Sequence, residues 1–252
     1  MSLAYRVIAR LDVKGENLIK GVQFEGLRVL GEPGAFAARY AASGADELLY
    51  FDSVASLYGR NQLTRLIEAT SAEAFVPLTV GGGIGNVEMA TEILRTGADK
   101  LAVNTAALRC PPLINALAAK FGSQAVCLSV EAKRVNGGWE AMTEGGRIPS
   151  GRSVLTWIAE AVERGAGEVL VTSVDCDGTR SGPDFDLIAA IGAIDVPVPF
   201  VYCGGVRLQD VEKVAAYTDG MAIGAALHYG DCTIADIKAK LAATQTIRID
   251  IV

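Results

Sequence analysis

The two halves of the amino-acid sequence resemble each other. The segment RYAASGADELLYFDS is matched later in the chain by AVERGAGEVLVTSVD, PLTVGGGI is matched by PFVYCGGV, and LDVK is matched by VEAK. A near-constant offset of about 120 residues over half of the chain indicates an internal duplication. Among the equivalent residues are Glu47 and Glu168, Gly82 and Gly204, and Asp12 and Glu131.

Short β-type runs alternate with helical patterns along the chain, which predicts a parallel α/β fold. Four βα units repeated twice predict a closed (βα)8 TIM barrel, with half-barrels at roughly 1–122 and 123–252. An open, doubly wound sheet is the alternative, but it does not predict a repeat. No linker rich in proline, serine or charge divides the chain, so we expect a single domain over 1–252. The expected strands are 6–12, 47–52, 76–80, 100–103, 125–131, 168–173, 199–202 and 220–223, and the helical patterns include 36–43, 63–70, 88–96, 113–121, 154–164 and 211–217.

The composition restricts the class of protein. Half of the 252 residues are hydrophobic, which is enough for a large core, and no apolar run is long enough to cross a membrane. The N-terminus does not resemble a signal peptide, so we expect a cytoplasmic protein. The net charge is −6 and the basic residues are scattered, which argues against binding to nucleic acid or to a membrane surface. Five cysteines without a Cys-x-x-Cys pair predict reduced, mostly buried thiols, and we expect neither a metal nor a cofactor.

Carboxylates occur where the expected strands end, which is the functional face of such a barrel. Asp12 is expected to close the first strand and Glu131 the fifth, on the opposite side. The two carboxyls would then face each other across the mouth, an arrangement suited to general acid and general base catalysis. A solvated or helix-capping role is the alternative for each acid taken alone. Further polar candidates near strand ends are Asp52, Thr172, Asp175 and Asp177.

Glycine-rich segments follow the expected strands 3 and 7, and small-residue segments follow strands 4 and 8. Glycine lets the backbone approach an anion closely, and a following helix directs its N–H groups at that anion. Loops after strands 7 and 8 form the usual phosphate site of this fold, and the repeat predicts a second site after strands 3 and 4. Two such sites on one mouth suit a substrate with a phosphate at each end. The candidate phosphate-binding residues are Gly82, Gly83, Asn104 and Thr105, with Gly178, Gly204, Gly205, Gly224 and Ala225 in the second half.

Two further residues have the chemistry to act in a site. Lys20 lies in the long segment between the first strand and the helix beginning near Pro33, a place where loops often close over a substrate. Its ammonium group would meet a phosphate or polarise a carbonyl, although solvated loop lysines are more common. His228, the only histidine, is expected to be a structural hydrogen-bonding residue.

The motifs LDVK, KGVQFEGLR, GADELLYFD, PLTVGGGI, GADKLAVNTAA, VEAKR, GGRIPSG and TSVDCDGT together resemble the cyclase subunit of imidazole glycerol phosphate synthase, over essentially the whole chain. The resemblance implies a (βα)8 lyase of histidine biosynthesis. Such a lyase uses ammonia to convert a phosphoribulosyl-formimino aminoimidazole carboxamide ribotide into imidazole glycerol phosphate and an aminoimidazole carboxamide ribotide. The substrate carries two phosphates, in agreement with the two glycine-rich sites. The isomerase of the same pathway shares the duplicated barrel, but KGVQFEGLR and GGRIPSG favour the cyclase.

The resemblance also implies a partner and assigns residues to roles. The family's ammonia comes from a glutaminase subunit that docks at the N-terminal face of the barrel to form a heterodimer. The ammonia then travels through the barrel interior. A charged layer that only closes the barrel bottom is the alternative for the residues at that entrance. By resemblance, the catalytic positions are Asp12 and Glu131, the ammonia gate is Arg6, Glu47, Lys100 and Glu168, the partner interface includes Asp99, and substrate binding involves Lys20, Asp52, Thr172 and Asp177.

The chain departs from the family pattern at three places. VEAKR stands where the family has IDAKR, so Glu131 replaces an aspartate, and ARLD stands where the family has PCLD, which introduces Arg10. Ala225 replaces a common serine. Together with SVASLYGRN, these departures keep open a paralogue that amidates a surface-sugar derivative with ammonia from a glutaminase. A catalytically inactive barrel that acts as a scaffold for a glutaminase is a third, less favoured hypothesis.

Overall fold

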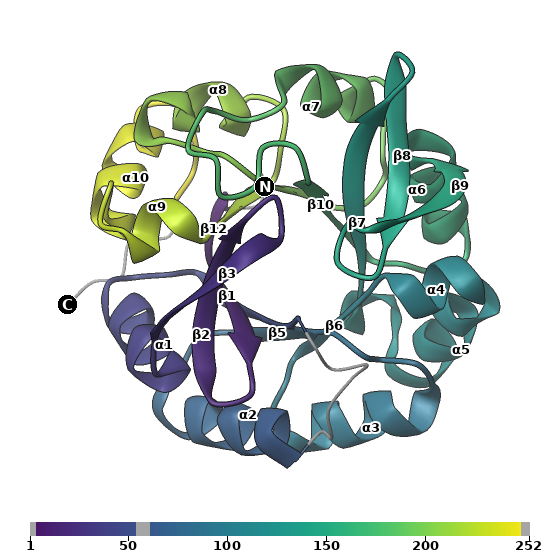
Figure 1. Cartoon of the computed structure of the whole chain (residues 1–252), viewed down its shortest axis with the longest axis horizontal. Coiled ribbons are helices and arrows are strands. Elements are labelled where there is room, and N and C mark those ends of the chain that lie inside the picture. Colours follow the sequence, from purple (N-terminus) through teal and green to yellow (C-terminus); the bar gives the residue numbers. More distant parts are fainter. Residues whose placement is uncertain (1–3, 54–60, 248–252) are drawn as a thin grey trace.

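Eight parallel strands close into a barrel within the part of the chain that the computed structural model describes, residues 4–53 and 61–247. Each strand pairs with the next, and the last pairs with the first, which confirms the predicted (βα)8 fold (Figure 1). The strands in order are β1 (Arg6–Lys14), β4 (Glu47–Asp52), β5 (Leu78–Gly81), β6 (Lys100–Val103), β7 (Val126–Val135), β10 (Glu168–Ser173), β11 (Phe200–Cys203) and β12 (Gly220–Ile223).

Helices follow the barrel strands and cover the outside of the barrel (Figure 1). Their ends carry the expected signals: Pro33 begins α1, the side chain of Asn86 caps α3, and Thr233 with Asp236 forms a capping box on α10. In the described residues no helix is both long and apolar enough to span a bilayer. The α-helices are α1 (Pro33–Ala42), α2 (Asn61–Glu73), α3 (Val87–Thr96), α4 (Thr105–Arg109), α5 (Pro112–Phe121), α6 (Val154–Glu163), α7 (Phe185–Gly192), α8 (Val211–Ala215), α9 (Ala225–His228) and α10 (Ile234–Leu241), with 3-10 turns at Ser123–Ala125 and Leu208–Asp210.

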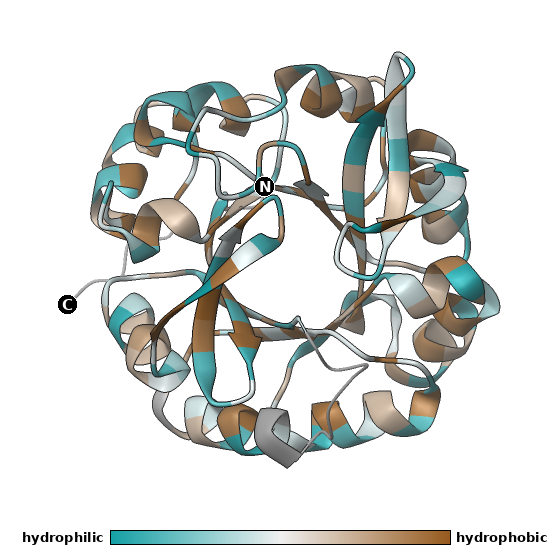
Figure 2. Ribbon diagram, in the orientation of Figure 1, coloured by the Kyte–Doolittle hydropathy of each residue, from teal (hydrophilic) through white to brown (hydrophobic). Residues whose placement is uncertain are grey.

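Each barrel strand presents alternate residues to two different cores. Along β1, the outward residues Val7, Ala9, Leu11 and Val13 pack in the large core under the helices, whereas Ile8 packs in a smaller core inside the barrel. Because side chains alternate along a strand, residues 6, 10 and 12 share the inward side with Ile8. The apolar filling of the interior consists of Ile8, Leu49, Ala102, Cys127, Leu170, Val201, Cys203 and Ala222, and the barrel strands and inner helix faces are largely hydrophobic in Figure 2.

Two antiparallel hairpins extend the barrel at its mouth, and the sequence did not predict them. β1 continues past Asp12 and pairs with β2 (Asn17–Val22), which pairs with β3 (Glu25–Gly31). β7 likewise continues past Glu131 to β8 (Gly138–Thr143) and β9 (Ile148–Ser153). The prediction that the two acids close their strands is therefore wrong. They stand where parallel pairing inside the barrel gives way to antiparallel pairing outside it.

Candidate active site at the barrel mouth

Asp12 and Glu131 lie at the same end of the barrel on opposite strands. In the sheet register Asp12 lies beside Phe51 of β4, and Glu131 lies beside Thr172 of β10. Both carboxyls are buried, with residue exposures of 6% and 8%. The duplication therefore brings its two related acids to one mouth, as the sequence predicts, but their surroundings differ.

Asp12 belongs to a buried network of alternating charges. Lys20, on β2, donates from Nζ to Oδ2 of Asp12 at 2.9 Å and to Asp177 at 2.7 Å. Arg10 donates from Nε to the other oxygen of Asp12 at 2.9 Å. Burial alone would raise the pKa of Asp12, but the charges of Arg10 and Lys20 outweigh burial and hold that pKa well below its usual range. Asp12 is therefore an anion at any pH near neutrality.

Glu131 has a different environment. Its Oε2 accepts a hydrogen bond from the backbone N–H of Gly146 at 2.7 Å, and among the described residues no cation forms an ion pair with it. Burial raises the pKa of Glu131 to about 7, although the Gly146 N–H and the charge of Arg10 partly oppose this rise. A carboxyl with this pKa gains and loses its proton near neutral pH, which is what general acid–base catalysis requires.

Arg10 is the residue of the mouth whose place the sequence did not predict. Its side chain is only 3% exposed and donates from Nη1 to Oγ1 of Thr172 at 2.8 Å, in addition to its bond to Asp12. Its guanidinium also lies 4.7 Å from the ring centroid of Phe51. The alternation along β1 was the signal that could have placed Arg10 inside the barrel, on the same side as Asp12.

Two cavities open at the mouth and divide the predicted phosphate residues according to the half of the chain. The larger has a volume of about 1040 Å³ and the smaller about 300 Å³. Glu131 and Arg10 line the larger cavity, whereas Asp12, Lys20 and Thr172 line neither cavity and are bonded to one another through Arg10 and Asp12. The larger cavity is lined by Asp52, Gly82, Gly83, Asn104 and Thr105, and the smaller by Asp177, Gly178, Gly204, Gly205, Gly224 and Ala225.

The glycine pairs of the two cavities have matching backbones. Gly82 has φ of 102° and Gly204 has φ of 111°, while Gly83 and Gly205 have φ of 64° and 73°. These angles lie in the region that favours glycine. A Cβ added at Gly82 would lie 2.4 Å from the carbonyl oxygen of Asp52, which is too close for any side chain. The duplication has thus preserved two cradles that only glycine can form.

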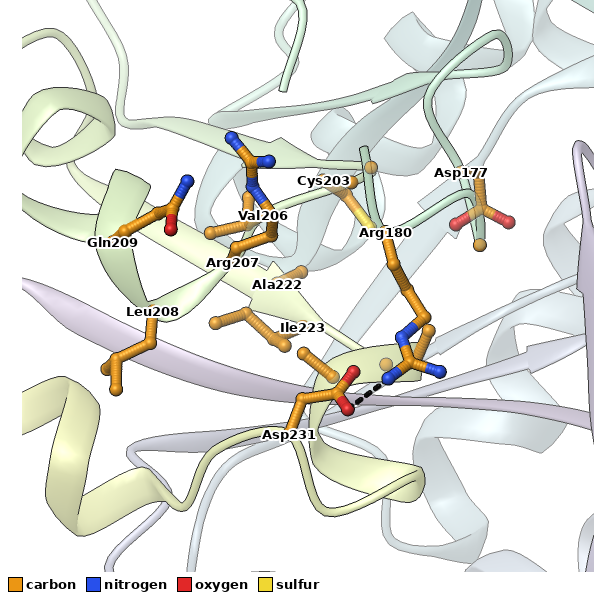
Figure 3. A pocket seen from close by; sticks show the side chains of 16 residues that line it. Asp177, Arg180, Cys203, Val206, Arg207, Leu208, Gln209, Ala222, Ile223 and Asp231 are labelled. Atoms are coloured by element: carbon orange, nitrogen blue, oxygen red, sulfur yellow. Dashed lines mark hydrogen bonds and ion pairs between the residues drawn. The ribbon is translucent and has the colours of Figure 1, made fainter. Parts of the chain in front are cut away.

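Arginine side chains surround the smaller cavity, and the sequence analysis did not select them. Figure 3 shows Arg180 joined to Asp231, with Arg207 and Gln209 on another side of the cavity. Arg207 is held by Asp210 through a 2.7 Å contact from Nε. Each arginine is paired with a carboxylate, so the two add guanidinium N–H donors to the cavity wall rather than net positive charge, and such donors bind anions.

A closed ring of four charges lies at the opposite, N-terminal end of the barrel. Arg6 contacts Glu47 at 3.0 Å and Glu168 at 2.7 Å. Lys100 contacts the same two carboxylates at 2.7 Å and 3.0 Å. Positive and negative groups therefore alternate around the ring, and the apolar interior separates this ring from Arg10 at the mouth.

Two other predicted residues have structural partners. Oδ2 of Asp99 accepts a hydrogen bond from the backbone N–H of Leu78 at 2.8 Å, and Asp46 and Asp219 make the same kind of bond at other strands. His228 bonds through Nδ1 to the hydroxyl of Tyr40 at 2.7 Å, and burial lowers its pKa to about 4. The structural role expected for His228 agrees with this packing.

Known proteins resemble the chain over most of its length. The family model described as histidine biosynthesis protein matches residues 6–233. Imidazole glycerol phosphate synthase subunit HisF of Legionella pneumophila is 53% identical over 201 residues, which cover 79% of this chain and 94% of the relative. The subunit HisF of Gluconacetobacter diazotrophicus is 45% identical over 95% of this chain and 94% of its own, and that of Mycobacteroides abscessus 43% identical over 96% and 98%.

Proposed function

Because the chain belongs to the histidine biosynthesis protein family, we propose that its barrel mouth is the active site of the family's ammonia-dependent cyclase. Its reaction is that of imidazole glycerol phosphate synthase, a lyase reaction. The reaction converts a phosphoribulosyl-formimino aminoimidazole carboxamide ribotide into imidazole glycerol phosphate and an aminoimidazole carboxamide ribotide. One observation carries the assignment of the site: two glycine cradles of matching backbone geometry lie at the end of the barrel that holds Asp12 and Glu131, and Glu131 lines the larger of the two cavities.

The two carboxyls have complementary roles in this proposal. Ammonia loses protons as its nitrogen forms bonds to carbon, and the departing groups gain protons. Glu131, with a pKa of about 7, donates a proton to a departing group and takes one from the nitrogen. Asp12 remains ionised, orients Lys20, and stabilises positive charge that develops on the nitrogen. The substrate is held between these groups by its two phosphates.

The proposed phosphate sites follow the two cavities. Gly82, Gly83, Asn104 and Thr105 hold one phosphate, and the residues of the smaller cavity hold the other, with Arg180 and Arg207 nearby. Asp52, Thr172 and Asp177 complete the substrate site as positioning or contact residues. The two cavities differ in volume, about 1040 Å³ against about 300 Å³. We propose that the larger one takes the bulkier end of the unsymmetrical substrate.

A turnover assay tests this function directly. The purified chain, supplied with the bisphosphate substrate and an ammonium salt, is expected to consume the substrate and release both products in equal amounts. The same mixture without ammonium is the control and is expected to show no turnover. Failure to consume saturating substrate in the presence of ammonium would reject the proposed reaction.

The names of the relatives describe a subunit, which supports a complex. We propose that the partner is a glutaminase that docks at the N-terminal face, near Asp99, and forms a heterodimer with this chain. Ammonia would then pass the charged ring and move through the apolar interior, which admits a neutral molecule more readily than an ion. The cytoplasmic location expected from the sequence remains a prediction.

The variant Lys100→Met tests whether the charged ring at the N-terminal face is an ammonia gate or only a structural layer. The change leaves Glu47 and Glu168 facing each other with one cation, so we expect the free energy of unfolding to fall by about 3 kcal/mol. If the ring is a gate, glutamine-driven turnover in the glutaminase complex also falls relative to ammonium-driven turnover. An unchanged ratio of the two rates, with lower stability in urea unfolding, would contradict the gate. Lys14→Met, at the exposed end of β1, is the matched control.

A second candidate function, amidation of a surface-sugar derivative, is favoured by one observation. Arg10 and Glu131, two departures from the family pattern, both line the larger cavity. Residues 54–60 of the SVASLYGRN stretch lie outside the described part of the chain. The double variant Arg10→Cys, Glu131→Asp restores the family residues at these two positions. A gain of tenfold or more in turnover of the histidine-pathway substrate, roughly 1.4 kcal/mol of barrier, would favour the sugar reaction for the wild type, whereas a loss would argue against it.

A further inference from the structure

Arg10 occupies the boundary between the apolar interior of the barrel and its mouth. It lies one inward position above Ile8, which belongs to the interior core, and one below Asp12. Its guanidinium is fixed on several sides: Nε on Asp12, Nη1 on Thr172 and on Sγ of Cys203 at 3.4 Å. The rings of Phe51 and Phe24 lie 4.7 Å and 5.5 Å from it. A side chain held in this way has a single orientation and carries its charge at a fixed place.

This fixed charge divides the two carboxyls of the mouth into unequal partners. Asp12 receives one cation on each oxygen, from Arg10 and from Lys20. Lys20 is shared with Asp177, so the network holds two cations and two anions and is neutral as a whole. Glu131 lies outside this network, and its hydrogen-bond donors, the backbone N–H of Gly146 and the side chain of Asn104, are neutral.

We propose that Arg10 is a positioning residue that fixes Asp12 as a permanent carboxylate and thereby leaves Glu131 as the one carboxyl of the mouth that exchanges protons with the substrate. The role rests on the function proposed above, since it concerns the same carboxyls. It also gives a physical account of two departures from the family pattern together: Arg10 adds a second cation to the carboxylate that Lys20 already contacts, which makes Asp12 a weaker proton acceptor. The remaining carboxyl must then be placed by its own contacts.

Burial and charge support this division of roles. Burial raises the pKa of Glu131, whereas the charges on both sides of Asp12 hold its pKa low against the effect of burial. A carboxyl with a strongly lowered pKa is a poor proton acceptor at neutral pH. Arg10 and Lys20 contact Asp12, and Asp177, Glu131 and His228 are the other titratable groups near enough to interact with this network electrostatically. Glu131 interacts with the Gly146 N–H, the Asn104 side chain, Arg10 and Asp12.

Arg10→Met tests the proposal, because methionine keeps much of the side-chain volume above the apolar interior and removes the charge. An adjacent Arg⁺ lowers the pKa of an aspartate by about 1–3 units, so the variant should titrate Asp12 higher by that amount. We expect the acid side of the profile of kcat/KM against pH to move to higher pH, with rates normalised to free ammonia. The alkaline side, set by Glu131, should also move up, because Arg10 lowers the pKa of Glu131 in the wild type.

A titration that needs no turnover keeps the test independent of the reaction. Carbon-13 NMR of protein labelled at the aspartate carboxyls follows Asp12, whose resonance is the one missing from Asp12→Asn. Arg10→Lys restores a positive charge and is expected to return the midpoint of Asp12 toward the wild-type value. Arg134→Met removes an arginine that binds Asp184 at 2.8 Å and lines neither cavity, so it should leave the Asp12 titration and turnover unchanged.

The outcomes are distinct. An unchanged Asp12 midpoint in Arg10→Met would overturn the proposal, as would pH profiles that superimpose after a uniform loss of rate. If Arg10→Met does not fold, an Arg10→Lys protein whose Asp12 titrates at neutral pH would overturn it. The titration midpoint of Asp12 could instead shift in Arg10→Met as expected while the wild type does not consume the bisphosphate. In that case the proposed reaction fails, and the control of the Asp12 charge by Arg10 stands.

Discussion

Replacing Asp12 with asparagine is expected to lower ammonium-driven turnover by about a thousandfold, within the range that a positioned acid–base or charge-stabilising group contributes. Asparagine has nearly the same shape but no charge. Arg10 and Lys20 would then share a single nearby anion, Asp177, and their buried charges would no longer be balanced. Lys20 would keep Asp177 but lose its ion pair with Asp12, and the positive charge that develops on the nitrogen of ammonia would lose its partner.

The measurement is kcat with saturating bisphosphate and ammonium, together with the melting temperature of each protein. Asp175→Asn is the matched control, because the Asp175 carboxylate accepts the backbone N–H of Arg134, away from the cavities. It should keep a turnover close to that of the wild type. A folded Asp12→Asn protein with turnover within about tenfold of the wild type would contradict a catalytic role for Asp12, since groups of this kind contribute more than that.

Shortening Glu131 to aspartate is expected to lower kcat by about a hundredfold, because a catalytic group misplaced by about 1 Å loses rate on that scale. The Glu131 carboxylate accepts the N–H of Gly146 at 2.7 Å, and Gly146 lies in the turn between β8 and β9. Aspartate would withdraw its carboxyl from that donor. The family's preference for aspartate at this position is therefore not expected to transfer to a mouth that contains Arg10.

The pH dependence distinguishes the role of Glu131 from a loss of shape. Glu131 must be protonated to donate, so wild-type kcat/KM, normalised to free ammonia, should fall as the pH rises through about 7. Glu131→Gln cannot exchange a proton and should be slow at every pH without this fall. Wild-type rates that are flat between pH 6 and pH 8, an interval around the pKa of about 7, would contradict the assignment.

Much of the fold could be predicted from the sequence because the internal duplication is still visible as repeated motifs. Eight β-type runs at repeated spacing have few closed arrangements, and the (βα)8 barrel was one of them. The paired glycines were informative for the same reason: a position such as Gly82 tolerates no side chain, so its repeat equivalent, Gly204, was retained. Arg6, Glu47, Lys100 and Glu168 begin their strands and contact one another as a ring, whereas their role as an ammonia gate stays a prediction.

The hairpins and Arg10 were less accessible to sequence reasoning. The turn at Asn136 and Gly137, with φ of 43° and 82°, is a common hairpin signal that could have predicted β8. The first hairpin has no such dipeptide, and its length resembles a loop. Arg10 interrupts an apolar run, and only closure of the barrel decides that an inward arginine finds Asp12 and Thr172 as partners. Contacts between residues so far apart in sequence depend on the fold as a whole.

Phosphorus-31 NMR of the bisphosphate substrate, titrated with the wild-type chain in the absence of ammonium, tests the central claim that one molecule spans both cradles of the mouth. Both phosphorus resonances are expected to shift together and to reach their end points at one equivalent of protein. A shift of one resonance alone, or saturation at two equivalents of ligand per chain, would contradict a single substrate held at both ends.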